Sequence, residues 1–272
     1  MNKGNKMCEF CKKHGGGKKW YFNPKNYSKE MGEARIEFLE KIAGKYFGKM
    51  MISDCETVEQ LKNIPVLNKL ALNLGEKYLE RTVGGQIIPI NDALNVLELC
   101  ENPAIMPCEC RRIAGEEKYC CFHFGLIPEL YEKANPDDYM EEVSVTKAER
   151  LLREWDKEGL YHNIVWGKAP YVISMCNCTP AYCIAHKGRF VTGLKNSMLK
   201  GEYVARVEDE KCQGCKTCLT RCQFGAISFN VDHVKAFIDI RKCTGCGLCV
   251  TECPNNTIQL IERQFTPAKN LW

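Results

Sequence analysis

The chain has 272 residues, enough for one compact domain with a small appended one or for two modest domains. Apolar residues make up 45% of it and charged residues 26%, and no apolar run approaches the roughly 18 residues of a membrane span, which argues against a membrane protein. The net charge of +4 is uneven, because residues 1–50 hold 12 Lys and Arg against 5 Glu. This segment is either a docking face for an acidic partner or a solvated lysine-rich surface.

The cysteine content is the unusual feature, with 19 cysteines in the chain. Such a density is typical of either a disulfide scaffold or a metal protein. Residues 1–8 lack the apolar segment of a secretory signal, and most cysteines lie two or three residues apart, which suits wrapping a metal better than closing long loops. We therefore expect thiolate ligands in the reducing cytoplasm of an anaerobic host.

Residues 1–90 are expected to form a helical region that begins with a candidate metal motif. Cys8, Cys11 and His14 form a C-x2-C-x2-H pattern, which could hold a metal if a fourth ligand comes from elsewhere. Two amphipathic helices follow, and their apolar stripes are expected to pack in the core. The stripes are Phe38, Leu39, Ile42, Tyr46 and Met50, then Leu67, Leu70, Ala71, Leu74 and Tyr78.

Residues 91–202 form a cysteine-rich α/β region in which seven cysteines have irregular spacing. They are Cys108, Cys110, Cys120, Cys121, Cys176, Cys178 and Cys183. A C-x-C pair lets both thiolates of one extended segment reach a single metal or cluster. One cubane needs four ligands and two need eight, so we favour at least one further Fe–S cluster here. Zinc sites, a redox-active thiol pair and plain buried cysteines are the alternatives.

Two solitary cysteines, Cys55 and Cys100, are expected to be core residues, and Cys100 is the candidate if the middle region needs an eighth ligand. Polar side chains beside the seven cysteines either hydrogen-bond to sulfur and supply protons or make ordinary surface ion pairs. These side chains are Arg111, Arg112, His123, His162 and His186.

A helix followed by a hairpin is predicted within this region. Thr146 to Glu149 reads as a capping box, and Gly159 suits the end of the helix. Residues 160–166 and 171–175 then read as two strands. This outline is that of a winged-helix unit, and it would hold the two C-x-C segments close together.

Residues 203–263 contain an internal repeat with an offset of 31 residues. Each half is C-x2-C-x2-C-x3-C, formed by Cys212, Cys215, Cys218 and Cys222 and then by Cys243, Cys246, Cys249 and Cys253. Three thiolates at such gaps wrap a cubane in one tight loop, and Gly214 and Gly245 allow the backbone to approach the sulfides. The fourth cysteine begins a short helix and faces the other way, so it ligates the other cluster.

The predicted ligands are therefore Cys212, Cys215, Cys218 and Cys253 for cluster one, and Cys243, Cys246, Cys249 and Cys222 for cluster two. A zinc site would leave the third cysteine of each half unexplained. The repeat resembles the bacterial two-cluster ferredoxins, with Gln223 where that family usually has proline. The resemblance implies two [4Fe–4S] clusters in a βαβ-βαβ module, and ligation by four thiolates favours low potential. Residues 226–229 and 234–238 read as strands that would form a small hairpin between the halves.

The larger arrangement resembles a group of little-characterised iron–sulfur proteins of anaerobes that carry a C-terminal ferredoxin module. The stretches that carry this resemblance are residues 107–111, residues 158–163 and residues 174–178. The resemblance implies metal binding in the middle region. Residues 264–272 are expected to be a small tail that folds back with Phe265 or Trp272 on the module.

We predict an α+β protein with a helical N-terminal half, a cysteine-rich middle and an appended ferredoxin module. The leading function is relay of low-potential single electrons between the ferredoxin clusters, a further cluster and a redox partner protein. The alternatives are a reductase that acts on a small-molecule substrate at an open cluster, and a redox-sensing DNA-binding regulator. Mixed charges on residues 146–158 argue against nucleic acid. Whether the protein is itself an oxidoreductase enzyme or a subunit of one is left open by the sequence, which shows no nucleotide-binding fingerprint.

Overall fold

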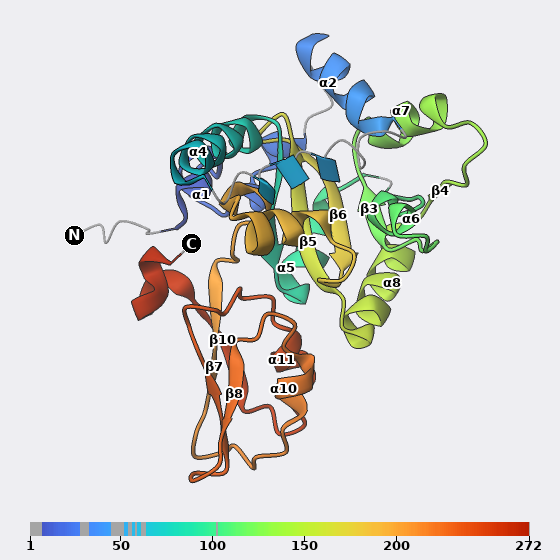
Figure 1. Ribbon diagram of the computed structural model, residues 1–272. Coiled ribbons are helices and arrows are strands. Elements are labelled where there is room, and N and C mark those ends of the chain that lie inside the picture. Colours follow the sequence, from blue (N-terminus) through green and yellow to red (C-terminus); the bar gives the residue numbers. More distant parts are fainter. Residues whose placement is uncertain are drawn as a thin grey trace.

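A six-stranded antiparallel sheet forms the centre of the larger body, and a smaller module lies beyond one end of its strands (Figure 1). The computed structural model describes residues 7–27, 33–44, 52–53, 56–57, 59–60, 64–101 and 103–271. The strand order is β1-β5-β6-β3-β2-β4. The strands are β1 (Val83–Ile88), β2 (Ala104–Ile105), β3 (Cys121–His123), β4 (Glu141–Glu142), β5 (Tyr161–Gly167) and β6 (Val172–Cys178).

Helices surround this sheet. The α-helices of the body are α1 (Glu9–His14), α2 (Glu33–Ala43), α4 (Pro65–Arg81), α5 (Ile90–Leu99), α6 (Glu109–Ile113), α7 (Ile127–Ala134), α8 (Val145–Glu158) and α9 (Ile184–His186). Short turns of tighter or wider helix are η1 (Trp20–Phe22), η2 (Pro24–Tyr27), η4 (Lys187–Thr192) and η5 (Lys195–Ser197). None of the described helices combines the length and the apolar character needed to cross a bilayer.

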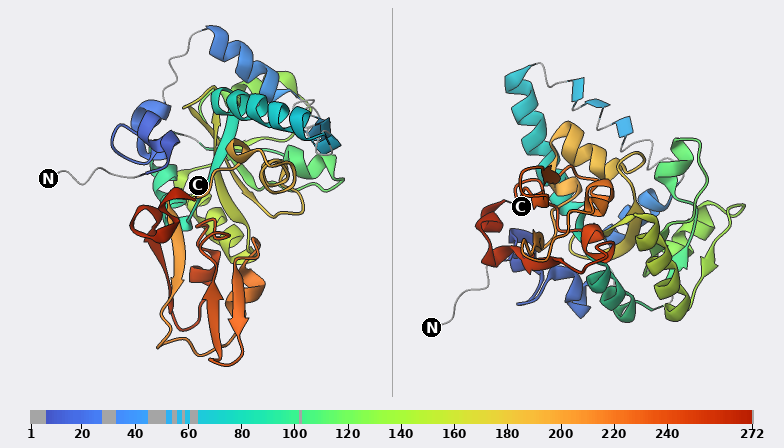
Figure 2. Two further views of the ribbon diagram at one scale, coloured as in Figure 1. Left: turned by 60° about the vertical axis from the view of Figure 1, so that its left-hand side comes forward. Right: turned by 90° about the horizontal axis from the view of Figure 1, so that it is seen from below.

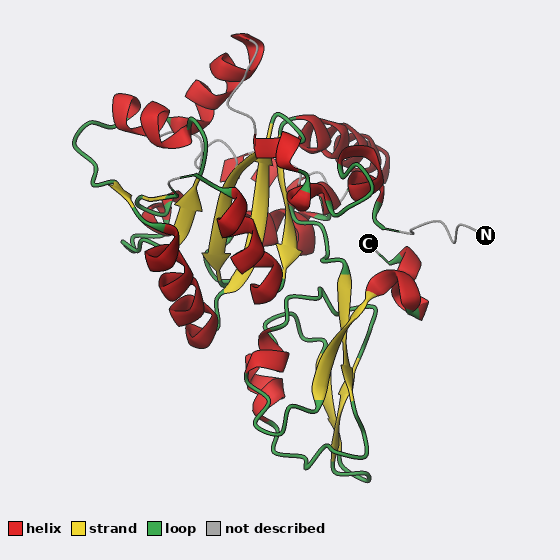
Figure 3. Ribbon diagram, turned by 180° about the vertical axis from the view of Figure 1, so that it is seen from behind, coloured by secondary structure: helices red, strands yellow, loops and turns green. Residues whose placement is uncertain are grey.

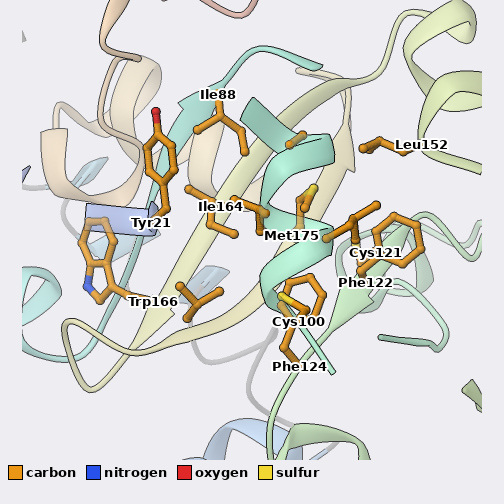
Figure 4. Packing of buried hydrophobic residues seen from close by; sticks show 14 of the residues in the cluster. Tyr21, Ile88, Cys100, Cys121, Phe122, Phe124, Leu152, Ile164, Trp166 and Met175 are labelled. Atoms are coloured by element: carbon orange, nitrogen blue, oxygen red, sulfur yellow. The ribbon is translucent and has the colours of Figure 1, made fainter. Parts of the chain in front are cut away.

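One face of the sheet carries the main apolar core. Side chains alternate between the two faces of a strand, so Ile164 and Trp166 of β5 point to the same side as Met175 of β6. Helices α5 and α8 pack there, together with the N-terminal segment that contains Tyr21 (Figure 4). The alternate residues of the same strands point to the other face of the sheet, and they include Cys121 of β3 and Cys176 and Cys178 of β6.

The C-terminal module consists of two βαβ units. They contain β7 (Tyr203–Val207), α10 (Thr217–Arg221) and β8 (Ile227–Asn230), then β9 (Lys235–Ile238), α11 (Leu248–Thr251) and β10 (Ile258–Glu262). Strand β7 pairs with β10 and β8 with β9, all antiparallel, and both helices lie on the same side of the strands (Figure 3). The hairpin predicted between the halves is therefore present. The tail continues as η6 (Arg263–Phe265) and η7 (Pro267–Asn270).

The structure also corrects several predictions. Strand β1 is an addition to the predicted elements: it lies in the N-terminal region that was expected to be helical, and it pairs with β5. Helix α8 is capped by Ser144, whose hydroxyl accepts from the Lys147 amide, rather than by Thr146. Gly159 ends this helix with φ +94°, as predicted.

The predicted apolar stripe of the second N-terminal helix is wrong as a packing surface. Leu67, Leu70, Leu74 and Tyr78 of α4 are 44–59% exposed. The helix instead packs through another face, where Gly75 closely approaches Leu194 and Leu79 is buried. Phe265 is likewise exposed, and Tyr46, Met50, Cys55 and Trp272 lie outside the described residues.

Candidate metal centres

One cavity in the module is surrounded by four cysteines drawn from both halves of the repeat. The set is Cys212, Cys215, Cys218 and Cys253, here called the distal set because none of these cysteines packs in the apolar cluster that the module shares with the body. Cys215 is exposed, the only exposed cysteine in the part of the chain that the structure describes. The grouping of three cysteines of one half with the fourth cysteine of the other is the one expected from the spacing.

A second cavity in the module is surrounded by Cys222, Cys243, Cys246 and Cys249, here called the proximal set. Burial raises the pKa of Cys246 to about 12, so without a metal this thiol is protonated at neutral pH. Binding a metal or cluster at this set must therefore release protons.

Backbone amides orient the thiols in the same way in both halves of the repeat. The amide of Ala226 donates to Cys222 Sγ at 3.3 Å, and the amide of Thr257, its equivalent 31 residues later, donates to Cys253 Sγ at 3.3 Å. Such bonds stabilise thiolate and fix its direction. The structure gives Gly245 a reason other than approach to sulfides, because a Cβ there would lie 2.3 Å from the Tyr203 carbonyl oxygen.

The seven irregularly spaced cysteines of the middle region converge in the body and are here called the central set. Strand geometry explains part of this convergence. Cys176 and Cys178 are two residues apart on β6 and so share a face, and Cys121 of β3 lies directly opposite Cys176. Cys108 and Cys183 immediately precede α6 and α9, which bring them to the same place.

Contacts between the thiols connect the central set. The sulfur atoms of Cys108, Cys120 and Cys121 lie within 4.8 Å of one another. Cys121 contacts Cys176, and Cys178 contacts Cys183. Six of the seven cysteines line one cavity of about 220 Å³, the other being Cys120. Cys100 lines a different cavity, so the structure does not bring it into this set.

The cavity of the central set has polar groups as well as thiols. His123 lies on its wall with Ser174, whose hydroxyl is 3.2 Å from His123 Nδ1. Burial lowers the pKa of His123 to about 4. The remaining wall includes apolar side chains such as Met106 and Ile173.

The other polar residues flagged in the sequence have structural contacts. His162 is fully buried on the opposite face of β5, where it bonds to Asn177 Oδ1 at 2.7 Å and Asp156 Oδ1 at 3.2 Å. Arg112 pairs with Asp138 at 2.8 Å.

Arg111 and His186 make ring contacts near the central set. Arg111 is buried, pairs with Glu116 and stacks over the Tyr182 ring at 4.2 Å. The His186 ring lies against Phe190, with their centroids 4.6 Å apart.

A buried apolar cluster joins the proximal set to the central set. It contains Cys178 and Cys183 with Tyr161, and Phe224 and Cys246 pack against it. The Tyr161 and Phe224 rings are 5.1 Å apart between centroids. The two cysteine sets are therefore separated by packed side chains rather than by solvent.

Polar contacts hold the module against α8 at the same junction. Arg221 donates to the Asp156 carbonyl and, at 3.0 Å, to the Lys157 carbonyl, at the end of the helix where unpaired carbonyls favour a cation. Gln223 donates to the Gly159 carbonyl. The residue that departs from the ferredoxin pattern thus has a partner in the body.

The N-terminal motif is only partly assembled as predicted. Cys8 and Cys11 lie together, but the third ligand-type side chain beside them is Glu202, whereas the His14 ring packs on Phe10 at 4.6 Å. The sequence analysis missed Glu202 and its neighbour Gln86, because each is an isolated polar residue with no local pattern. The pKa of the Cys11 thiol is raised, mainly by burial and further by the neighbouring Cys8 and Glu202.

The C-terminal module holds two pseudo-equivalent cysteine cavities in a βαβ-βαβ arrangement. Residues 205–260 match a family model described as a 4Fe-4S dicluster domain, which supports binding of 4Fe–4S clusters. The match covers the C-terminal module alone, and no curated protein matches the chain. Together with the cysteine content, it supports an iron–sulfur electron-transfer role.

Proposed function

We propose that this protein relays single electrons between its surface and a centre held by the central set. The spatial order of the three cysteine sets supports this relay. The distal set reaches the surface at Cys215, and the proximal set lies behind it. A buried group of apolar side chains then connects the proximal set to the central set. Clusters of the [4Fe–4S] type, when bound, supply one-electron transfer.

The chain contributes insulation and positioning to this relay. Phe224, Tyr161 and Leu248 exclude water between the proximal and central sets. Arg221 and Gln223 fix the module on α8, which keeps the separation between the two sets constant. A constant, dry separation favours electron transfer inside the protein over loss of electrons to solvent.

A redox partner protein is proposed to dock at the distal end. Val231 and Val234 are 77% and 56% exposed in the turn between β8 and β9, and Val234 lies against Gly214 of the distal loop. A Val231→Ser/Val234→Ser variant should slow reduction by a protein donor several-fold while reduction by a small photoreduced dye stays unchanged. Equal slowing with both donors would contradict docking at this turn.

The direct test of the relay is a count of iron and acid-labile sulfide per chain after anaerobic purification, with zinc measured alongside. A count near twelve or sixteen irons per chain would mean that the central set also holds one or two clusters. A count near eight would mean that only the module holds clusters. Spectra of the dithionite-reduced protein by electron paramagnetic resonance should then show a signal beyond that of the module. A folded but colourless and iron-free chain would overturn the proposal.

The central cavity favours a second candidate, a reductase that acts on a small molecule. The observation is that His123 and Ser174 share the cavity with six cysteines, so a bound molecule would meet a polar pair beside the thiols. A substrate should change only the resonance signal of the central centre, and His123→Ala should weaken that change. Unaltered spectra across candidate substrates would favour the simple relay.

A further inference from the structure

Three side chains of the kind that bind metals meet where the N-terminal segment approaches the module. Cys8 Sγ, Cys11 Sγ and a carboxylate oxygen of Glu202 all lie within 4.8 Å of one another. The three residues are 3%, 0% and 4% exposed, and Glu202 is separated from the cysteines by more than 190 residues of chain. Figure 2 shows the N-terminal segment and the C-terminal tail close together at this junction.

We propose that Cys8, Cys11 and Glu202 bind a single thiophilic divalent ion, Zn²⁺ or Fe²⁺, that is separate from the iron–sulfur clusters. Two thiolates and one carboxylate are a donor set that such ions accept, and the described residues supply three ligands. The set is too small for a cubane, which needs four. This site does not depend on the proposed relay.

The local backbone supports ligation by the two cysteines. The Cys11 amide donates to Cys8 Sγ at 3.3 Å, which stabilises a thiolate at Cys8 and turns it toward Cys11. Cys11 Sγ lies 3.1 Å from Glu202 Oε1. The C-x2-C spacing therefore places both sulfur atoms on the side that faces the carboxylate.

A second layer of side chains fixes the carboxylate. Gln86 of β1 donates from Nε2 to Glu202 Oε1 at 3.2 Å and to the Lys200 carbonyl at 3.0 Å. Its Oε1 accepts from Trp20 Nε1 at 2.7 Å, so the amide cannot turn over without losing these bonds. Gln86 is fully buried and acts here as a positioning residue.

Charge balance is also satisfied. Two thiolates and a carboxylate carry −3, a divalent ion brings +2, and the buried guanidinium of Arg263 is close enough to interact with both Glu202 and Cys8. Arg263 donates to the carbonyls of Gly201, Tyr203 and Cys243 at 2.8–3.0 Å, so its place is fixed. The assembled site is neutral overall, which burial requires.

The competing interpretation is that Glu202 is only a buried hydrogen-bond acceptor. Its Oε1 accepts from the Cys8 amide at 3.3 Å and from Gln86, and the Cys11 thiol points at it. That arrangement needs no ion and predicts no bound metal. Metal content therefore separates the two interpretations, independently of cluster loading.

The test uses the full chain, purified anaerobically with its iron–sulfur clusters. X-ray absorption at the zinc edge should show about one zinc per chain with sulfur ligands at about 2.3 Å and lighter ligands at about 2.0 Å. If ferrous iron occupies the site, Mössbauer spectra should instead show one high-spin Fe²⁺ beyond the cluster irons. Neither signal, in protein supplied with both metals, would overturn the proposal.

Variants locate the ion. Cys8→Ser/Cys11→Ser should remove it and leave the cluster iron and sulfide unchanged, and Glu202→Gln should speed its release to a chelator at least 10-fold. Cys100→Ser is the matched control, because Cys100 is a buried cysteine outside all of these sets. Retention of the ion by the double variant would contradict this site, and the wild-type spectra decide the matter even if that variant fails to fold.

Discussion

The module and the body hold cysteines in two different ways. In the module, three of four cysteines in each set lie within seven consecutive residues, so one loop forms most of a site. In the body, the central set extends from Cys108 to Cys183 and is assembled by pairing of β3 with β6 and by two short helices. Local sites are visible in the spacing of a sequence, whereas the central set becomes a site only when the sheet forms.

The comparison also separates cofactor binding from folding. The module loops have their own glycine turns and amide-to-sulfur bonds, so we expect them to keep their ligands when the central site is lost. The central set depends on the register of the sheet, in which a shift by one residue would turn Cys176 and Cys178 to the opposite face. Loss of the central site should therefore leave the module loaded.

The largest expected effect comes from Cys176→Ser/Cys178→Ser. This change removes two ligands from the same face of β6 and should abolish the central centre, lowering iron to about eight per chain. Iron and sulfide analysis with optical spectra checks it, and Cys100→Ser should leave the count unchanged. A double variant with wild-type iron would show that Cys176 and Cys178 are not cluster ligands.

Single changes at the fourth cysteines should sharpen the module side of the comparison. Cys253→Ser should perturb the cavity that holds Cys212, and Cys222→Ser the cavity that holds Cys243, each with a loss of up to about four irons. Electron paramagnetic resonance spectra of the two reduced variants should differ, because the Cys253 variant keeps an intact proximal set and the Cys222 variant keeps an intact distal set. Identical spectra would argue against ligation across the repeat.

A smaller effect is expected from Arg221→Ala/Gln223→Ala. The variant removes the side-chain donors to the Lys157 and Gly159 carbonyls and should destabilise docking of the module by about 2 kcal/mol. Thermal unfolding and protease cleavage near residue 202 would report it, and Arg206→Ala, an exposed change on β7, serves as the control. Cluster content should not change, since no ligand is removed.

The smallest predicted effect is that of Gly159→Ala. This residue has φ +94°, so a Cβ is strained, and it would lie 3.0 Å from Arg221 Nη1. We expect a loss of about 1 kcal/mol in the free energy of unfolding, measured by denaturant titration. No loss would mean that the end of α8 relaxes without affecting the junction.

The sequence predicted what local pattern encodes. Spacing within short segments predicts four features: the repeat, the two cysteine groupings, the β8–β9 hairpin and the helix that ends at Gly159. It also singled out the seven cysteines of the central set, which the structure brings together, although what they bind remains a proposal.

Long-range features were not predictable in the same way. Strand β1, with two glycines, lacks the alternation of a typical strand and is defined by its partner β5. The exposed stripe of α4 has the period of a packed one, and only tertiary contacts at Gly75 and Leu79 decide which face is buried. Glu202 joins Cys8 and Cys11 through chain topology, for which a single sequence carries no signal.

The hydrogen bond between the Cys8 amide and Glu202 has a consequence for synthesis of the chain. During translation, the first cysteines leave the ribosome long before residue 202 exists, so their final acceptor is missing while the whole sheet is being made. This bond can therefore form only after translation has passed residue 202.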